Sequence, residues 1–198
     1  MRDVDWDRMY LRQAQRAADI APWLRQLDLR PGDRCIDMGC GPGYFSLLLA
    51  AEVGAAGRVY AIDDSATALD RLAREQSARG VANICRIRAD GAAAQLPVGD
   101  APADAALVAM MLHHAEDPAG VLGNVARLVR PMGRVVVAEF RPDAPGAVGP
   151  ALARRLAPEA VRAWCEAAGL EIILLERGTP EHYLLVCRRP AAPAGSPS

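Results

Sequence analysis

A glycine-rich turn between an apolar strand and an apolar helix constrains this chain more than any other feature. The sequence RCIDMGCGPGYFSLLLAA predicts a buried strand at 35–38, a turn that contains Gly39, Gly41 and Gly43, and then a helix. Glycines have no Cβ atom, so the backbone of such a turn can approach a ligand closely. The unsatisfied amides of the first helical turn point into the same space. The pattern predicts a site for a nucleotide-type ligand.

The glycine spacing and the acid before it indicate the kind of ligand. Dinucleotide sites use G-x-G-x-x-G to hold a pyrophosphate, whereas this turn reads G-x-G-x-G after Asp37. An acid there would repel a pyrophosphate and would suit the sulfonium and ammonium groups of S-adenosylmethionine. At these residues the sequence resembles the class I S-adenosylmethionine-dependent methyltransferases, whose first motif is (D/E)-x-G-x-G-x-G. Cys40 lies inside the turn, and we expect a small cofactor contact there, with a reactive or metal-binding thiol as the alternative.

Composition excludes several other classes of protein. The 198 residues, about half of them apolar, fit one domain with a sizeable core. A net charge of -1 predicts no broad nucleic-acid surface, and no run approaches the roughly 20 apolar residues of a membrane span. We therefore expect a cytoplasmic enzyme, monomeric or homodimeric. The absence of lysine excludes a phosphate-loop lysine and a Schiff base, and the five cysteines show no C-x-x-C pairing typical of zinc or disulfide frameworks.

Acids follow the next two predicted strands. Strand 58–62 ends at Asp63 and Asp64, and a carboxylate at this position can accept hydrogen bonds from ribose hydroxyls. Strand 83–89 ends at Asp90 and Gly91. The family resemblance implies that this acid accepts from the adenine amino group and that the Gly91 amide donates to the ring. The alternatives are structural acids at a strand end or in a turn.

Two histidines follow the fourth predicted strand, 104–111. Met110, near the end of this strand, is expected to contact the cofactor. His113 and His114 fall on a loop at the carboxyl end of this strand, where open α/β sheets bind ligands. Either histidine could remove a proton from the methyl acceptor or orient it. The alternative is that one caps backbone groups or packs on the cofactor. Adjacent histidines seldom converge on one ion, so we predict no metal site with Glu116.

The remaining segments complete the predicted architecture. Residues 4–28 have helical spacing interrupted at Pro22, and this helix either covers the ligand mouth or packs on the sheet edge. A fifth strand, 134–140, carries Glu139 toward the same edge, and the loop 143–150 after it is the expected substrate lid. A helix follows from Pro158 to Gly169. Strands 170–176 and 183–187 are joined by a short turn and must pair antiparallel.

Together these elements predict a Rossmann-like α/β fold of the class I methyltransferase type. Its mostly parallel seven-stranded sheet has a C-terminal antiparallel hairpin and helices on both faces. We expect an N-terminal helical segment at 1–29, the methyltransferase domain at 30–189 and a disordered tail at 190–198.

The phrases DMGCGPGYF and LHHAEDP resemble small-molecule methyltransferases, a group that includes quinone C-methyltransferases. The resemblance implies direct SN2 methyl transfer to a small-molecule acceptor, with S-adenosylhomocysteine as the product. A non-catalytic S-adenosylmethionine-binding domain and an NAD(P)-dependent oxidoreductase are the alternatives.

Overall fold

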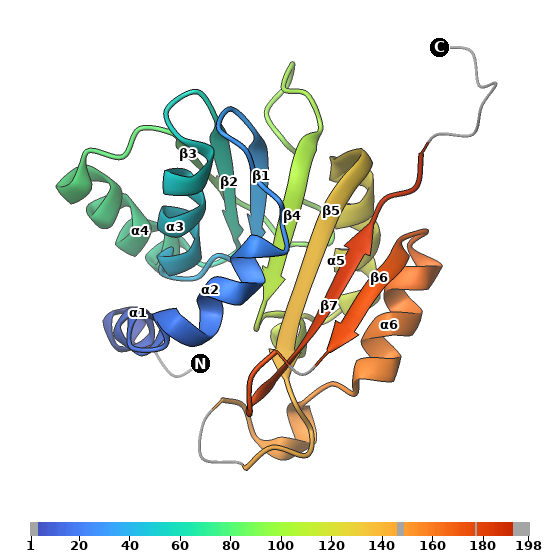
Figure 1. Ribbon diagram of the computed structural model, residues 1–198. Coiled ribbons are helices and arrows are strands. Elements are labelled where there is room, and N and C mark those ends of the chain that lie inside the picture. The colour runs from blue at the N-terminus through green and yellow to red at the C-terminus, as the bar shows by residue number, and fades with distance from the viewer. Residues whose placement is uncertain (1–3, 146–148, 177, 192–198) are drawn as a thin grey trace.

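A seven-stranded sheet forms the centre of the computed structural model, which describes residues 4–145, 149–176 and 178–191 (Figure 1). The strand order is β3-β2-β1-β4-β5-β7-β6. The first five strands in this order run parallel, and β7 pairs antiparallel with β5 and β6, which confirms the predicted sheet. The strands are β1 (Arg34–Met38), β2 (Arg58–Asp63), β3 (Ile84–Arg88), β4 (Ala103–Ala109), β5 (Val129–Phe140), β6 (Glu171–Glu176) and β7 (His182–Arg188).

Helices cover both faces of this sheet and create two core clusters. Side chains of α2, α3 and α4 pack in one cluster, and those of α5 and α6 pack in the other. None of the described helices is long and apolar enough to cross a membrane. The helices are α1 (Trp6–Ala14), α2 (Ala17–Arg25), α3 (Tyr44–Val53), α4 (Ala66–Arg79), α5 (Pro118–Leu128) and α6 (Pro158–Ala167), with short 3-10 turns η1 (Leu112–His114) and η2 (Leu152–Arg154).

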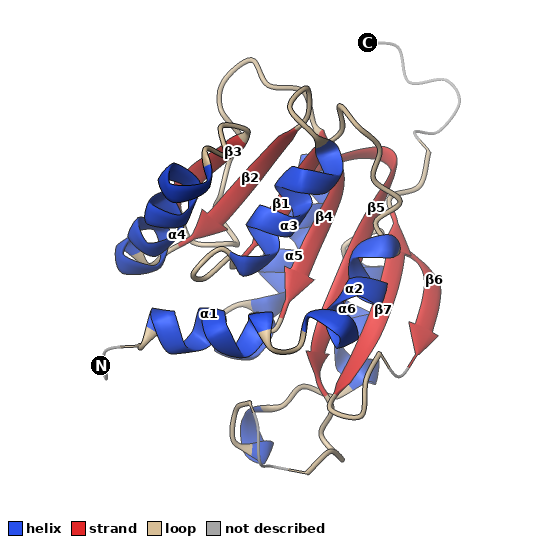
Figure 2. Ribbon diagram, turned by 60° about the vertical axis from the view of Figure 1, so that its left-hand side comes forward, coloured by secondary structure: helices blue, strands red, loops and turns tan. Residues whose placement is uncertain are grey.

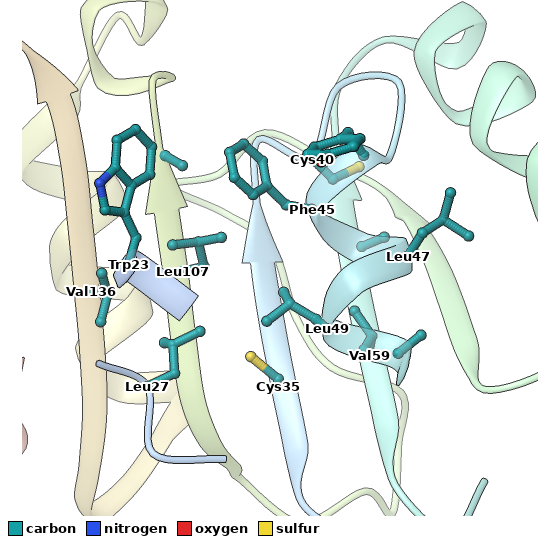
Figure 3. Packing of buried hydrophobic residues seen from close by; sticks show 14 of the residues in the cluster. Trp23, Leu27, Cys35, Cys40, Phe45, Leu47, Leu49, Val59, Leu107 and Val136 are labelled. Carbon is teal, nitrogen blue, oxygen red and sulfur yellow. The ribbon is translucent and has the colours of Figure 1, made fainter. Parts of the chain in front are cut away.

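The apolar runs of the central strands follow from burial on both faces. Cys35 of β1 packs in the cluster shown in Figure 3, together with Phe45 and Leu49 of α3. Ile36, the next residue, belongs to the cluster on the opposite face. Successive side chains of a strand point to opposite faces, so a strand covered by helices on both sides needs apolar residues at consecutive positions.

The N-terminal segment breaks at a different place from the one predicted. Pro22 does not interrupt the helix but lies inside α2, and the chain instead bends at Gln15 and Arg16. Ile20 and Trp23, on either side of the proline, are buried, so their packing holds the second turn of α2 against the sheet. Figure 2 shows α1 lying beyond the carboxyl ends of β2 and β4.

The fifth strand also begins earlier than predicted. β5 starts at Val129 instead of residue 134, Met132 within it has a φ of 65°, and the pairing of β5 with β4 shifts register. The preceding helix accordingly ends at Leu128. Part of the predicted lid, 146–148, and the tail 192–198 lie outside the described residues.

Replacing Gly43 should destabilise the fold strongly. Its φ is 85°, and a Cβ at this position would lie 2.3 Å from Leu72 Cδ1. We expect Gly43→Ala to lower the free energy of unfolding by about 3 kcal/mol through overpacking and backbone strain. Gly80 is the control, because its φ is 65° but a Cβ there meets no atom within 4 Å, and Gly80→Ala should cost about 1 kcal/mol. Equal losses in urea unfolding would contradict this reading.

Candidate functional site

The glycine turn after β1 is held by its neighbours in a conformation that suits glycine. Gly39 has a φ of 70°, and a Cβ there would lie 2.6 Å from Met111 Cβ. The amides of Gly39 and Cys40 donate to the carbonyl of Ile62 at 2.8 and 3.0 Å. The turn therefore lies against the ends of both β2 and β4. Gly43, also in the left-handed region, is the N-cap of α3.

Asp63 connects this turn to the start of α4. Its Oδ2 accepts from the Gly41 amide at 2.8 Å, and its Oδ1 accepts from the Ser65 amide at 2.9 Å. Burial raises the pKa of this carboxyl, and the two amides lower it. A carboxylate has about four acceptor positions, so Asp63 keeps acceptor capacity beyond these two bonds. Asp64, the next residue, is exposed.

Asp37 is buried behind the turn, with 1% of its surface exposed. Its Oδ2 accepts from Ser46 Oγ at 2.6 Å. Burial raises the pKa of Asp37 to about 7, the Ser46 hydrogen bond opposes this, and the charge of Asp63 adds to it. Within the described parts of the chain, neither Asp37 nor Asp63 forms an ion pair with an arginine or histidine. A ligand with positive charge would stabilise both carboxylates.

The remaining predicted cofactor residues lie at the ends of β3 and β4. Asp90 is exposed, and its Oδ1 accepts from the Ala92 amide at 2.7 Å. This bond is the one expected of a structural acid in a turn, which was the alternative to adenine recognition. Asn124 Nδ2 donates to the Gly91 carbonyl at 2.8 Å and fixes this turn. Met110 has a φ of 54°, and its amide donates to the carbonyl of Ala138 at 2.7 Å. The parallel strands thus bring acids and turns to one edge of the sheet (Figure 1).

His113 is part of a buried pair rather than an open loop. It lies in η1, and its Nδ1 is 2.8 Å from Oε2 of Glu139. The other oxygen of Glu139 accepts from the Leu112 amide at 2.8 Å. Glu139 lies at the expected edge but has no exposed surface, so it does not face substrate. It faces His113 instead and fixes the orientation of that ring.

His114 lies beside this pair but outside its hydrogen bonds. The rings of His113 and His114 have centroids 4.1 Å apart. Burial lowers the pKa of His114, and the neighbouring His113 and Arg154 lower it further. His114 is therefore neutral near pH 7. Among the described residues, no group of three histidine, cysteine or acidic side chains is arranged to hold a metal ion.

Two contacts of the site were not predicted from the sequence. Ser46, in the first turn of α3, is the hydrogen-bond partner of Asp37, and its position after the glycine turn was the only available signal. Trp6 of α1 donates from Nε1 to Thr67 Oγ1 at 2.9 Å. A Cβ at Gly41 would lie 3.6 Å from the Trp6 ring, which places α1 beside the glycine turn.

Comparisons with known proteins agree with this geometry. A family model described as a methyltransferase domain matches residues 36–137. An uncharacterized 37.1 kDa protein in transposon TN4556 of Streptomyces fradiae is 38% identical over 117 residues, which are 59% of this chain and 32% of that protein. A 2-phytyl-1,4-naphtoquinone methyltransferase of Trichormus variabilis is 33% identical over 116 residues, which are 58% of this chain and 50% of that protein. The chain spans half or less of the length of these two relatives.

The fold has a counterpart among solved structures. The crystal structure of a SAM-dependent methyltransferase from Aquifex aeolicus superposes with a TM-score of 0.82. The match covers 94% of this chain and 100% of the other at 18% sequence identity. At this identity the likeness concerns the fold alone.

The buried charge of Asp37 should make the stability of the protein depend on pH. A carboxyl whose folded pKa is about 7 instead of 3.8 binds more protons in the folded state, so its contribution to stability falls as pH rises from about 4 to 7. Asp37→Asn keeps an acceptor for Ser46 and removes this charge. We expect the variant to gain stability over wild type at pH 8, by up to about 4 kcal/mol, and little at pH 4. Urea unfolding at both pH values measures the gain, and an equal difference at both would contradict the assignment.

Proposed function

The chain belongs to the family of methyltransferase domains, and we propose that it transfers the methyl group of S-adenosylmethionine to a small-molecule acceptor. One observation carries the choice of cofactor. Two acids, the buried Asp37 and the half-buried Asp63, flank a glycine turn and have no cationic partner in the described chain. A cofactor with a sulfonium and an ammonium group supplies the missing positive charge. A pyrophosphate-bearing nicotinamide cofactor would add negative charge to the same place.

The residues at the sheet edge fit the three parts of this cofactor. Asp37 and the amides of the glycine turn, Gly39 to Gly43, would hold the methionine end. Asp63, with Asp64 beside it, would accept from the ribose hydroxyls. Asp90 and Gly91 would read the adenine edge, because an acid and an amide match its donor and acceptor. Met110 lies half-buried at the end of β4, between this region and the histidines.

The buried pair of His113 and Glu139 supports a catalytic role for this region besides cofactor binding. The Glu139 carboxylate accepts the proton of His113 Nδ1, so the neutral ring has its lone pair on Nε2. Nε2 can then take a proton from a hydroxyl, amine or activated carbon of the acceptor. Bound S-adenosylmethionine supplies a methyl group that its positive sulfur already activates. The protein therefore has to orient the acceptor in line, exclude water and remove one proton.

Helix α1 is suited to exclude water from the cofactor. Besides the Trp6 contact, Tyr10 packs edge-on against Tyr44 of α3, with ring centroids 5.5 Å apart. Arg79 Nη2 of α4 donates to the Tyr10 hydroxyl at 2.8 Å, and Arg71 Nε pairs with Asp7 at 2.5 Å. The Arg79 hydrogen bond and the Arg71–Asp7 ion pair are partly exposed, so these two contacts can open at small cost. We propose that the N-terminal segment acts as the lid of the site.

Removing the ribose-binding acid should weaken cofactor binding. We expect Asp63→Ala to lower the affinity for S-adenosylhomocysteine at least tenfold, because it removes a charged acceptor and releases the Gly41 amide. Asp70→Ala is the control, since it removes an exposed carboxylate of α4 away from the glycine turn. Calorimetric titration measures both variants. Wild-type affinity in Asp63→Ala would remove this residue from the cofactor site.

Replacing His113 should slow the reaction without weakening cofactor binding. We expect His113→Asn to lower kcat about 100-fold on an acceptor that must lose a proton, with the affinity for S-adenosylhomocysteine within twofold of wild type. Glu139→Gln should give a smaller loss of kcat, because the ring keeps a hydrogen-bond partner but loses the charge. Turnover of radiolabelled methyl groups is the measurement. An unchanged kcat in His113→Asn would reduce the residue to a packing role.

A further inference from the structure

Two adjacent arginines lie at the end of η2, in the loop between β5 and α6. Arg155 is 7% exposed, and its guanidinium donates to the carbonyls of Arg141, Ala144 and Pro150 at 2.9, 3.3 and 3.2 Å. These carbonyls come from the beginning and the later part of the loop, so one side chain holds the two parts together. Figure 1 shows the described parts of this loop beyond the carboxyl end of β5, at the edge of the candidate site.

Arg154, the other arginine, is exposed and lies beside the two histidines of the candidate site. Its Nη2 is 3.5 Å from the carbonyl oxygen of His113, to which it donates. After burial and the neighbouring His113, the charge of Arg154 is the next cause that lowers the pKa of His114. His114 is exposed as well, and its ring packs against the ring of His113. The anchored loop therefore presents a guanidinium next to both histidines.

The guanidinium of Arg154 has hydrogen-bonding capacity that the described chain does not use. A guanidinium carries five N–H donors in a planar fork. The side chain of Arg154 makes one hydrogen bond to the described residues, the contact with His113, and it forms no ion pair with a described acid. By contrast, Arg162 on the surface of α6 pairs with Glu166 at 2.9 Å. Arg154 thus keeps an exposed positive charge without an acidic partner in the described chain.

The proposed base is accessible beside this guanidinium. Nδ1 of His113 is bound to Glu139, and Nε2 makes no hydrogen bond to the described residues. This nitrogen is not among the buried side-chain atoms of the described chain that lack a partner, so it reaches the surface without any movement of the chain. An acceptor at Nε2 can therefore extend past the exposed ring of His114 to Arg154.

We propose that Arg154 binds a carboxylate of the methyl acceptor, so that the acceptor is an organic acid whose methylated group lies at His113. The planar fork of a guanidinium matches the two oxygens of a carboxylate. The inference rests on the proposed function, and it adds the charge of the acceptor and the residue that selects it.

The charges around the candidate site agree with an anionic acceptor. A carboxylate at Arg154 compensates a charge that the described chain leaves unpaired, and it is also attracted to the positive sulfur of the bound cofactor. The opposing charge of Glu139 is buried, where its oxygens bind His113 and the Leu112 amide. His114 is exposed, and its neutral ring has one donor and one acceptor for a hydrogen bond with the same ligand.

The test uses a ring and a chain compound, each as an acid and as its neutral amide: 4-hydroxybenzoate with 4-hydroxybenzamide, and 3-hydroxybutyrate with 3-hydroxybutyramide. Ligand-observed NMR titration measures their affinities for the protein saturated with S-adenosylhomocysteine. We expect both acids to bind about tenfold more tightly than their amides, because the hydrogen bonds to Arg154 are charge-assisted. Arg154→Gln should abolish this preference, and Arg154→Lys should keep part of it. Arg162→Gln, which removes an exposed arginine of α6, is the control and should keep it in full.

The outcomes separate this inference from the proposed function. A preference for the acids that is lost in Arg154→Gln but kept in Arg162→Gln, with S-adenosylhomocysteine affinity intact, supports the inference. Equal affinities for acids and amides, an unchanged preference in Arg154→Gln, an equal loss in Arg162→Gln, or no binding of either acid by a protein that binds S-adenosylhomocysteine overturns the inference alone. No binding of S-adenosylhomocysteine overturns the proposed function and this inference with it.

Discussion

The candidate site depends on the glycine turn after β1. Two neighbouring side chains leave no room for a Cβ atom at Gly39 and Gly43 in this turn. Met111 occupies the space beside Gly39, and Leu72 occupies the space beside Gly43. The backbone of the turn therefore lies directly on the ends of β2 and β4 and at the start of α3. This position brings the Gly41 amide to the Asp63 carboxylate. One steric constraint thus sets the places of the turn amides, the acid of β2 and the first turn of α3.

The electrostatics of the site follow from where the parallel strands end. β1 and β2 deliver Asp37 and Asp63 to one edge, where burial disfavours their charges and no arginine of the described residues pairs with them. β4 and β5 deliver His113 and Glu139 to the same edge as a buried pair. In the proposed function, the acids favour a cationic ligand, and His113, held by Glu139, supplies a base beside it. We propose that this division of roles lets the fold bind a sulfonium cofactor and act on a second molecule.

The sequence was sufficient for features that depend on neighbours along the chain. Apolar runs, glycines and a short final turn predicted the strands, the mostly parallel sheet and its antiparallel hairpin. The sequence was insufficient for contacts between residues that lie far apart along the chain. The pairing of His113 with Glu139 and the contact of Trp23 with His182 depend on strand register and on the path of α2, which no local pattern specifies. The bend at Gln15 was missed because Pro22 was the only local sign of a helix break. Burial of Ile20 and Trp23 keeps Pro22 inside α2 despite that sign.

The most direct test of this account is calorimetric titration of the purified protein with S-adenosylhomocysteine, with NADH titrated under the same conditions. The account predicts one site per chain with micromolar affinity for S-adenosylhomocysteine and no heat of binding with NADH. Binding of NADH, or no binding of S-adenosylhomocysteine, would contradict the claim that Asp37, Asp63 and the glycine turn form a site for a cationic cofactor.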